Sequence, residues 1–150
     1  MKSVIRAAFA AAMLFAADPA LAKNELSPAD LSALKGYTLS MDKINAMQAA
    51  MDEAEKSGKH EDMTKVGEAK SVAEMESRLK AMPGVMAVFT KHGLGAHDVV
   101  VMPIALMDAG MCVAYPAAAS KLADRVSPAQ ITFYKQHQAE LKKVKWLNGG

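Results

Sequence analysis

The chain has 150 residues, a formal net charge of +2, a single cysteine and only 5% aromatic residues. This near-neutral balance gives no electrostatic footprint for nucleic acid or for an anionic membrane surface. A single cysteine excludes an internal disulfide, so the stability of the fold must come from packing.

Residues 1–22 have the layout of a secretory signal peptide. Lys2 and Arg6 give a basic start, a short apolar run follows, and Ala20-Leu21-Ala22 supplies the small residues typical of a cleavage site. The apolar run is too short to span a bilayer. We therefore expect cleavage near Ala22 and one domain of residues 23–150, periplasmic or secreted, with no integral membrane segment after cleavage.

The first part of the mature chain carries helix signals and no clean strand pattern. Ser27-Pro28-Ala29-Asp30 predicts the start of a short helix that Gly36 ends. Ser40 can cap a second helix over 41–56, whose apolar residues recur at three- and four-residue steps. Residues 59–70 are polar and indicate a loop with room for one helical turn.

The second part continues the helical pattern. Ser71-Val72-Ala73-Glu74 has the pattern of a capping box, and Pro83-Gly84 should break the helix that it starts and open another. A long apolar stretch predicts a central helix over about 96–115, which Pro103 should kink or divide. Residues 117–125 fit either a short helix or a loop. Ser127-Pro128-Ala129-Gln130 repeats the helix-start pattern and opens the last helix.

These elements predict an all-α fold. A helix that is apolar nearly all round belongs inside a layer of amphipathic helices. We expect a small irregular or orthogonal bundle of five to six helices around the kinked central helix. A four-helix up-and-down bundle is the second choice, because the proline breaks favour shorter pieces.

The central stretch contains His97, Asp108 and Cys112, which look at first like a catalytic set. Eleven residues of helix put His97 about 16 Å from Asp108 along the axis, whereas a hydrogen-bonded relay needs about 3 Å. Asp108 lies one turn from Cys112, and a nearby carboxylate disfavours the reactive thiolate. We therefore predict no catalytic residues. Asp108 itself must point outward or pair with a Lys, Arg, Tyr or His from a neighbouring helix.

Twelve residues of the chain are methionine, and pairs such as Met47/Met51 and Met107/Met111 are four apart. Thioethers at this spacing could bind Cu(I), although methionine is also a common core filler. Noncovalent haem b held by a histidine and a methionine is also allowed, whereas covalent attachment is excluded because no C-x-x-C-H occurs. The histidines available as axial ligands are His92, His97 and His137.

The sequence therefore favours an exported, non-catalytic helical domain that binds a partner protein, a small apolar ligand or another copy of itself, with no cofactor. The candidate ligand-binding residues are His97, Met107, Asp108 and Met111. The alternative is a binder of copper or haem b, for which the candidate metal residues are Met47, Met51, His92 and His97. An enzyme of unknown class is the third choice.

Overall fold

The computed structural model describes residues 26–57 and 64–148, and every regular element within these ranges is helical. The all-α prediction is confirmed. The elements are α3 (Pro28–Gly36), α4 (Met41–Ser57), α5 (Thr64–Gly67), α6 (Val72–Lys80), α7 (Pro83–Lys91), α8 (Ala96–Ala114), α9 (Pro116–Lys121), α10 (Pro128–Leu141) and the 3₁₀ turn η1 (Lys145–Leu147). The predicted signal peptide lies outside the described residues.

The number of helices was predicted wrongly. The described residues form eight α-helices rather than five to six. The additional elements are short: α5 has four residues and α9 has six, and neither is long enough to show a helical periodicity in its sequence. Pro103 does not divide the central helix, since α8 runs through it. Pro103 is buried, so packing on either side holds the helix together despite the hydrogen bond that proline cannot donate.

Two helix starts follow the predicted chemistry closely. The Ser27 hydroxyl accepts a hydrogen bond from the Asp30 amide, and the Asp30 carboxylate accepts one from the Ser27 amide. Ser127 and Gln130 make the same reciprocal pair at the start of α10. These capping boxes satisfy amide groups that would otherwise lack a partner in the first turn.

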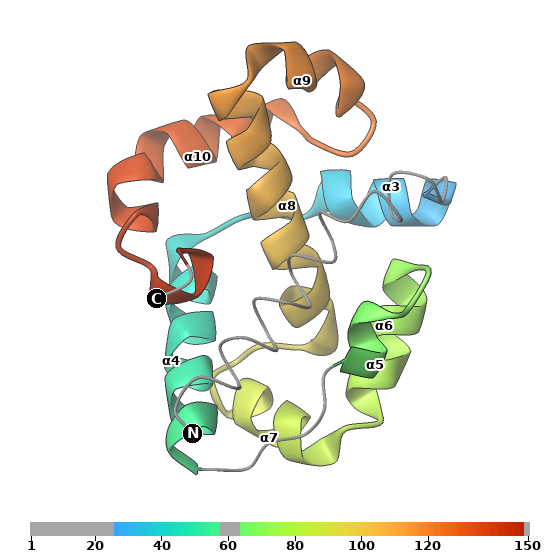
Figure 1. Cartoon of the computed structure of the whole chain (residues 1–150), viewed down its shortest axis with the longest axis vertical. Coiled ribbons are helices and arrows are strands. Elements are labelled where there is room, and N and C mark those ends of the chain that lie inside the picture. Colours follow the sequence, from blue (N-terminus) through green and yellow to red (C-terminus); the bar gives the residue numbers. More distant parts are fainter. Residues whose placement is uncertain (1–25, 58–63, 149–150) are drawn as a thin grey trace.

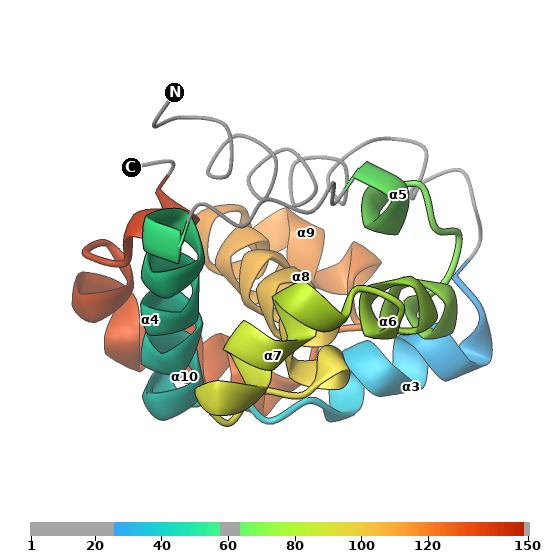
Figure 2. The same ribbon diagram turned by 90° about the horizontal axis from the view of Figure 1, so that it is seen from below.

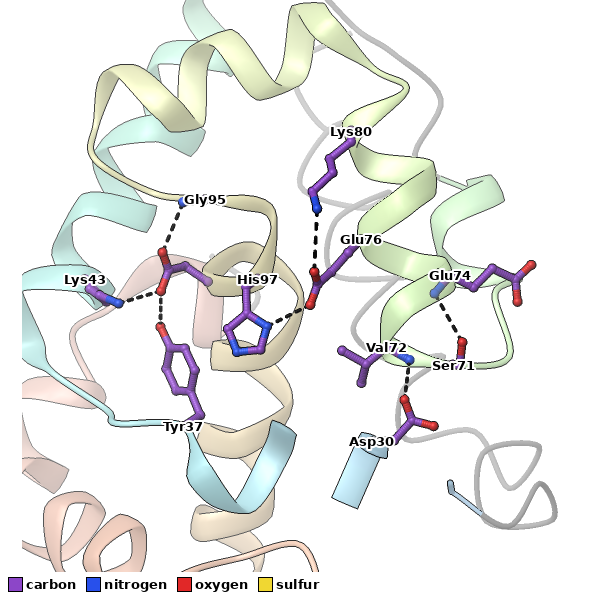
Figure 3. Close-up of polar contacts among 11 residues, drawn as sticks. Asp30, Tyr37, Lys43, Ser71, Val72, Glu74, Glu76, Lys80, Gly95 and His97 are labelled. Carbon is purple, nitrogen blue, oxygen red and sulfur yellow. Dashed lines mark hydrogen bonds and ion pairs between the residues drawn. The ribbon is translucent and has the colours of Figure 1, made fainter. Parts of the chain in front are cut away.

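The predicted capping box at Ser71 forms only in part. The Ser71 hydroxyl accepts from the Glu74 amide, as expected, but the Glu74 carboxylate accepts from the Lys70 amide, one residue before the cap. Asp30 of α3 also satisfies an amide at this helix start: its buried carboxylate accepts a hydrogen bond of 2.8 Å from the Val72 amide (Figure 3). One carboxylate thus caps α3 and joins it to the start of α6.

Helix α8 lies at the centre of the molecule. Figures 1 and 2 both place α4 and α10 on one side of it and α3 and α6 on the other. Among the described residues it is the one helix long and apolar enough to cross a membrane, judged by length and composition, and most of it is buried inside the protein. A core helix shows this same combination.

The buried apolar residues form two clusters. The main cluster contains residues from every long helix, and it includes Met47 and Met51 of α4. A smaller one, here called the satellite cluster, lies around the second half of α8 and consists of buried Ala109, Cys112 and Val126, with Ala119, Leu122, Ile131 and Tyr134 packed against it. The ring of Tyr134 approaches Gly110 so closely that a β-carbon there would lie 2.9 Å from it.

Gln130 provides a test of how α10 holds α3. Its buried side-chain amide donates hydrogen bonds to the carbonyl oxygens of Leu34, at 2.7 Å, and Tyr37, at 2.9 Å. We expect Gln130→Leu to lower the free energy of unfolding by about 2–4 kcal/mol, because it removes both of these hydrogen bonds and the one that Gln130 Oε1 accepts from the Ser127 amide. Urea denaturation measures this. Gln136→Leu, at an exposed position of α10, serves as the control, and equal losses in the two variants would contradict the prediction.

Candidate functional site

The first polar site lies at the start of α8, around Asp98. Its carboxylate accepts hydrogen bonds from the Tyr37 hydroxyl at 2.7 Å, from Lys43 Nζ at 2.6 Å and from the Gly95 amide at 3.0 Å (Figure 3). The sequence identified Asp98 only as a favourable first-turn acid. It gave no sign of Tyr37 and Lys43, which lie 61 and 55 residues away along the chain.

The electrostatics of this site favour a fixed network. Burial alone would raise the pKa of Asp98, but the hydrogen bonds from Lys43, Gly95 and Tyr37 outweigh it and lower the pKa below its ordinary value. Burial and the Asp98 carboxylate raise the pKa of the Tyr37 hydroxyl far above its usual range, so Tyr37 remains a donor. The group therefore ties α3, α4 and α8 together and offers no free acid or base.

His97, a predicted ligand-binding residue, lies beside this network. Its side chain is exposed, its Nδ1 is 2.7 Å from Glu76 Oε1 of α6, and its ring packs against Tyr37 (Figure 3). Asp108, which lies on the other half of α8, has a different partner. His97 and Asp108 therefore belong to separate sites, which agrees with the separation calculated from the helix rise.

The residues of the copper and haem alternative all have partners of another kind. Met47 and Met51 are buried in the main cluster. His92 Nε2 lies 2.8 Å from the carboxylate of Glu53 on α4, and His137 pairs with Glu140. Within residues 26–57 and 64–148, no group of three or more His, Cys, Asp or Glu side chains could hold a metal ion. Binding of Cu(I) or haem b stays a prediction.

The second polar site is the ion pair between Asp108 and Arg125. The Asp108 side chain is 2% exposed, and its Oδ1 contacts the guanidinium of Arg125, which lies in the turn after α9. This decides between the two predicted alternatives: the carboxylate is buried and paired. Among the described residues, Asp108 Oδ2 and Arg125 Nε are buried without a hydrogen-bond partner. Burial raises the pKa of Asp108, and the charge of Arg125 opposes that shift only in part.

Cys112 lies one turn beyond Asp108 and is buried in the satellite cluster. Burial and the negative charge of Asp108 raise the pKa of its thiol. The resting thiol is therefore protonated, as expected from the sequence, and a protonated thiol is a poor nucleophile. The sequence was correct that Asp108 and Cys112 are neighbours and correct about the sign of their interaction.

The end of α8 carries exposed apolar side chains. Among the described residues, Met111 and Tyr115 are the large hydrophobic residues that lie open to solvent, with exposed fractions of 44% and 63%. Their small neighbours Ala114, Pro116 and Ala117 are exposed as well. We call these five residues the α8 tip. Met111 was a predicted site residue and Met107 is half-buried, whereas the sequence gave no sign that Tyr115 is exposed.

The lowered pKa of Asp98 predicts a pH effect on stability. A carboxyl group whose folded pKa is depressed contributes stability above its unfolded pKa, near 3.8, and loses it as pH falls through the folded pKa. We expect Asp98→Asn to lower the free energy of unfolding by about 1–3 kcal/mol at neutral pH, because hydrogen bonds to a charged group are lost. The variant should also lose less stability than the wild type on acidification.

Urea denaturation at neutral pH and below pH 3.8 measures both effects. The matched control is Asp42→Asn, which changes an exposed acid in the first turn of α4 and leaves the Asp98 network intact. This control should keep the pH dependence of the wild type. An Asp98→Asn variant with the same pH dependence as Asp42→Asn would show that Asp98 does not stabilise the fold through its charge.

Comparisons of the chain with protein-family models, with curated proteins and with solved structures find no match. The function is therefore inferred from the two polar sites and the α8 tip, on their own chemistry.

Proposed function

We propose that the protein is an exported, non-catalytic binding domain that engages a partner protein through the α8 tip. The observation that carries this proposal is the exposure of Met111 and Tyr115, one turn apart at the end of a helix that is otherwise largely buried. Large apolar side chains exposed next to each other are unfavourable in water, and such patches mark interaction sites.

The residue types at the α8 tip fit a protein partner. Tyrosine combines a large apolar ring with a polar hydroxyl and is enriched at the centres of interfaces. Methionine is flexible and can adapt to the shape of a bound surface. Ala114, Pro116 and Ala117 are small, so a partner can come close to the backbone next to Tyr115. A flat or helical apolar surface on the partner suits this arrangement.

The polar groups support a role without catalysis. The Asp98 carboxylate already accepts three hydrogen bonds from within the protein. The Asp108 carboxylate is paired with Arg125, and the Cys112 thiol is buried with a raised pKa. A general base or nucleophile must reach its substrate in the correct protonation state, which these groups do not offer at rest. Export is supported by the N-terminal signal pattern of residues 1–22.

Site-specific photocrosslinking tests the proposed surface. The full chain is produced in its native cells with the photoreactive amino acid benzoylphenylalanine in place of Tyr115, and a matched variant carries it in place of Ala49, an exposed residue of α4. We expect a discrete adduct after irradiation from position 115 and none from position 49. Met111→Glu in the Tyr115-substituted chain should weaken the adduct, because a charge disfavours burial of the patch.

The masses of the products separate the outcomes. An adduct that contains a different protein identifies the partner, and an adduct of twice the mass of the chain shows that the partner is a second copy. Equal labelling at positions 115 and 49 would contradict the proposed surface. The same mass measurement tests export, since the uncrosslinked protein should begin near Lys23, and a chain that retains residues 1–22 would contradict cleavage.

A further inference from the structure

Residues 116–125, which comprise α9 and the turn after it, form a segment here called the flap. None of these ten residues is buried, whereas Cys112 before the flap and Val126 directly after it are. Figure 1 shows α9 at one end of the molecule, beyond the end of α8. A segment without a buried residue contributes little to the main core, and such segments open at a lower free energy than the rest of a protein.

The flap packs against the end of α8, and apolar and polar contacts attach it there. Ala119 and Leu122 pack against the satellite cluster. Lys35 Nζ of α3 donates an exposed hydrogen bond of 2.8 Å to the Ala123 carbonyl. Arg125 of the flap also forms an ion pair with Asp108 of α8, and within residues 26–57 and 64–148 this is the one contact of the flap that involves a buried charge.

This ion pair is poorly satisfied when the flap is closed. Asp108 Oδ2 and Arg125 Nε both lack a hydrogen-bond partner among the described residues, although both atoms are buried. Opening would return both atoms to water at the cost of the charge attraction. Because removal of charged groups from water largely offsets their attraction, the intact ion pair by itself adds little to the stability of the closed arrangement. Burial also raises the pKa of Asp108, as expected for a charge that is incompletely solvated.

The backbone allows the flap to move as a unit. Tyr115 is the one residue between α8 and α9, and its backbone is not helical, with φ of −130° and ψ of 87°. On the other side, Val126 precedes Ser127, whose capping box holds the start of α10 by itself. Rotation at these two points would lift the flap without breaking either neighbouring helix.

We propose that the flap opens as a unit on the folded domain, with the Asp108–Arg125 ion pair as its latch. Opening uncovers Ala109, Cys112 and Val126 of the satellite cluster. It moves Pro116 and Ala117 of the α8 tip, while Met111, the neighbour of Cys112 in α8, stays in place. The flap thereby controls how much apolar surface is offered to a partner. That purpose rests on the proposed function, whereas the motion itself does not.

Cys112 is the only thiol of the chain and reports directly on the flap, since it is buried in the satellite cluster. The experiment measures the rate at which dithionitrobenzoate labels Cys112 at a fixed pH, in urea concentrations below the unfolding transition. Local opening of the flap exposes little surface, so its labelling rate should depend weakly on urea, whereas labelling through global unfolding follows the full denaturant dependence.

Arg125→Gln removes the latch charge and should raise the labelling rate at least about tenfold, because a buried carboxylate without its partner favours the open flap. Loss of a positive charge would by itself raise the thiol pKa and slow the reaction, so this side effect cannot produce the expected increase. The matched control is Lys121→Gln, at an exposed position of α9. It should label at the rate of the wild type.

Two results would overturn the proposal. One is labelling of the wild type with the full urea dependence of global unfolding, and the other is equal labelling of Arg125→Gln and Lys121→Gln. If Arg125→Gln does not fold, Arg125→Lys, which keeps the charge but not the planar fork, should still label faster than the wild type, and an unchanged rate would refute the latch. These measurements need no partner, so their failure is distinct from failure of the crosslinking at Tyr115.

Discussion

The need to bury α8 determines how this small domain is built. The helix has 19 residues and enough apolar surface to cross a membrane, most of it is buried, and other helices lie on both sides of it (Figure 1). Burial of apolar side chains is the main favourable term in folding, and the internal disulfide that could assist it is excluded. The two acidic residues of α8, Asp98 and Asp108, must therefore be accommodated within or beside this packing.

These two acids are accommodated in different ways, so the two ends of α8 are held differently. Asp98 accepts three hydrogen bonds and joins α3, α4 and α8. Asp108 is more deeply buried, yet one of its oxygens has no partner among the described residues. The first end of α8 is consequently fixed, whereas the second end holds a small satellite cluster and a segment without buried residues. The exposed Met111 and Tyr115 lie at this second end.

Local chemistry made part of this structure predictable. The serine caps at residues 27 and 127 and the extent of the central helix follow from neighbouring residues and from an apolar run. The partners of the acids do not, since Arg125 and Tyr37 reach them through the tertiary fold. The exposure of Tyr115 could not be predicted from the sequence either, because an apolar residue at the end of an apolar run has the same local pattern as a core residue.

The proposed motion requires that the flap is attached less firmly than the helix beneath it. Native-state hydrogen exchange compares the two directly, at the amide of Leu122 and at the amide of buried Leu106 in α8. The Leu122 amide bonds to the Ala118 carbonyl within α9, and this six-residue helix is too short to keep that bond once the flap has left α8. We predict that Leu122 exchanges through a local opening with weak dependence on denaturant, and that Leu106 exchanges only through global unfolding. Exchange of both amides with the same free energy and the same denaturant dependence would contradict the account.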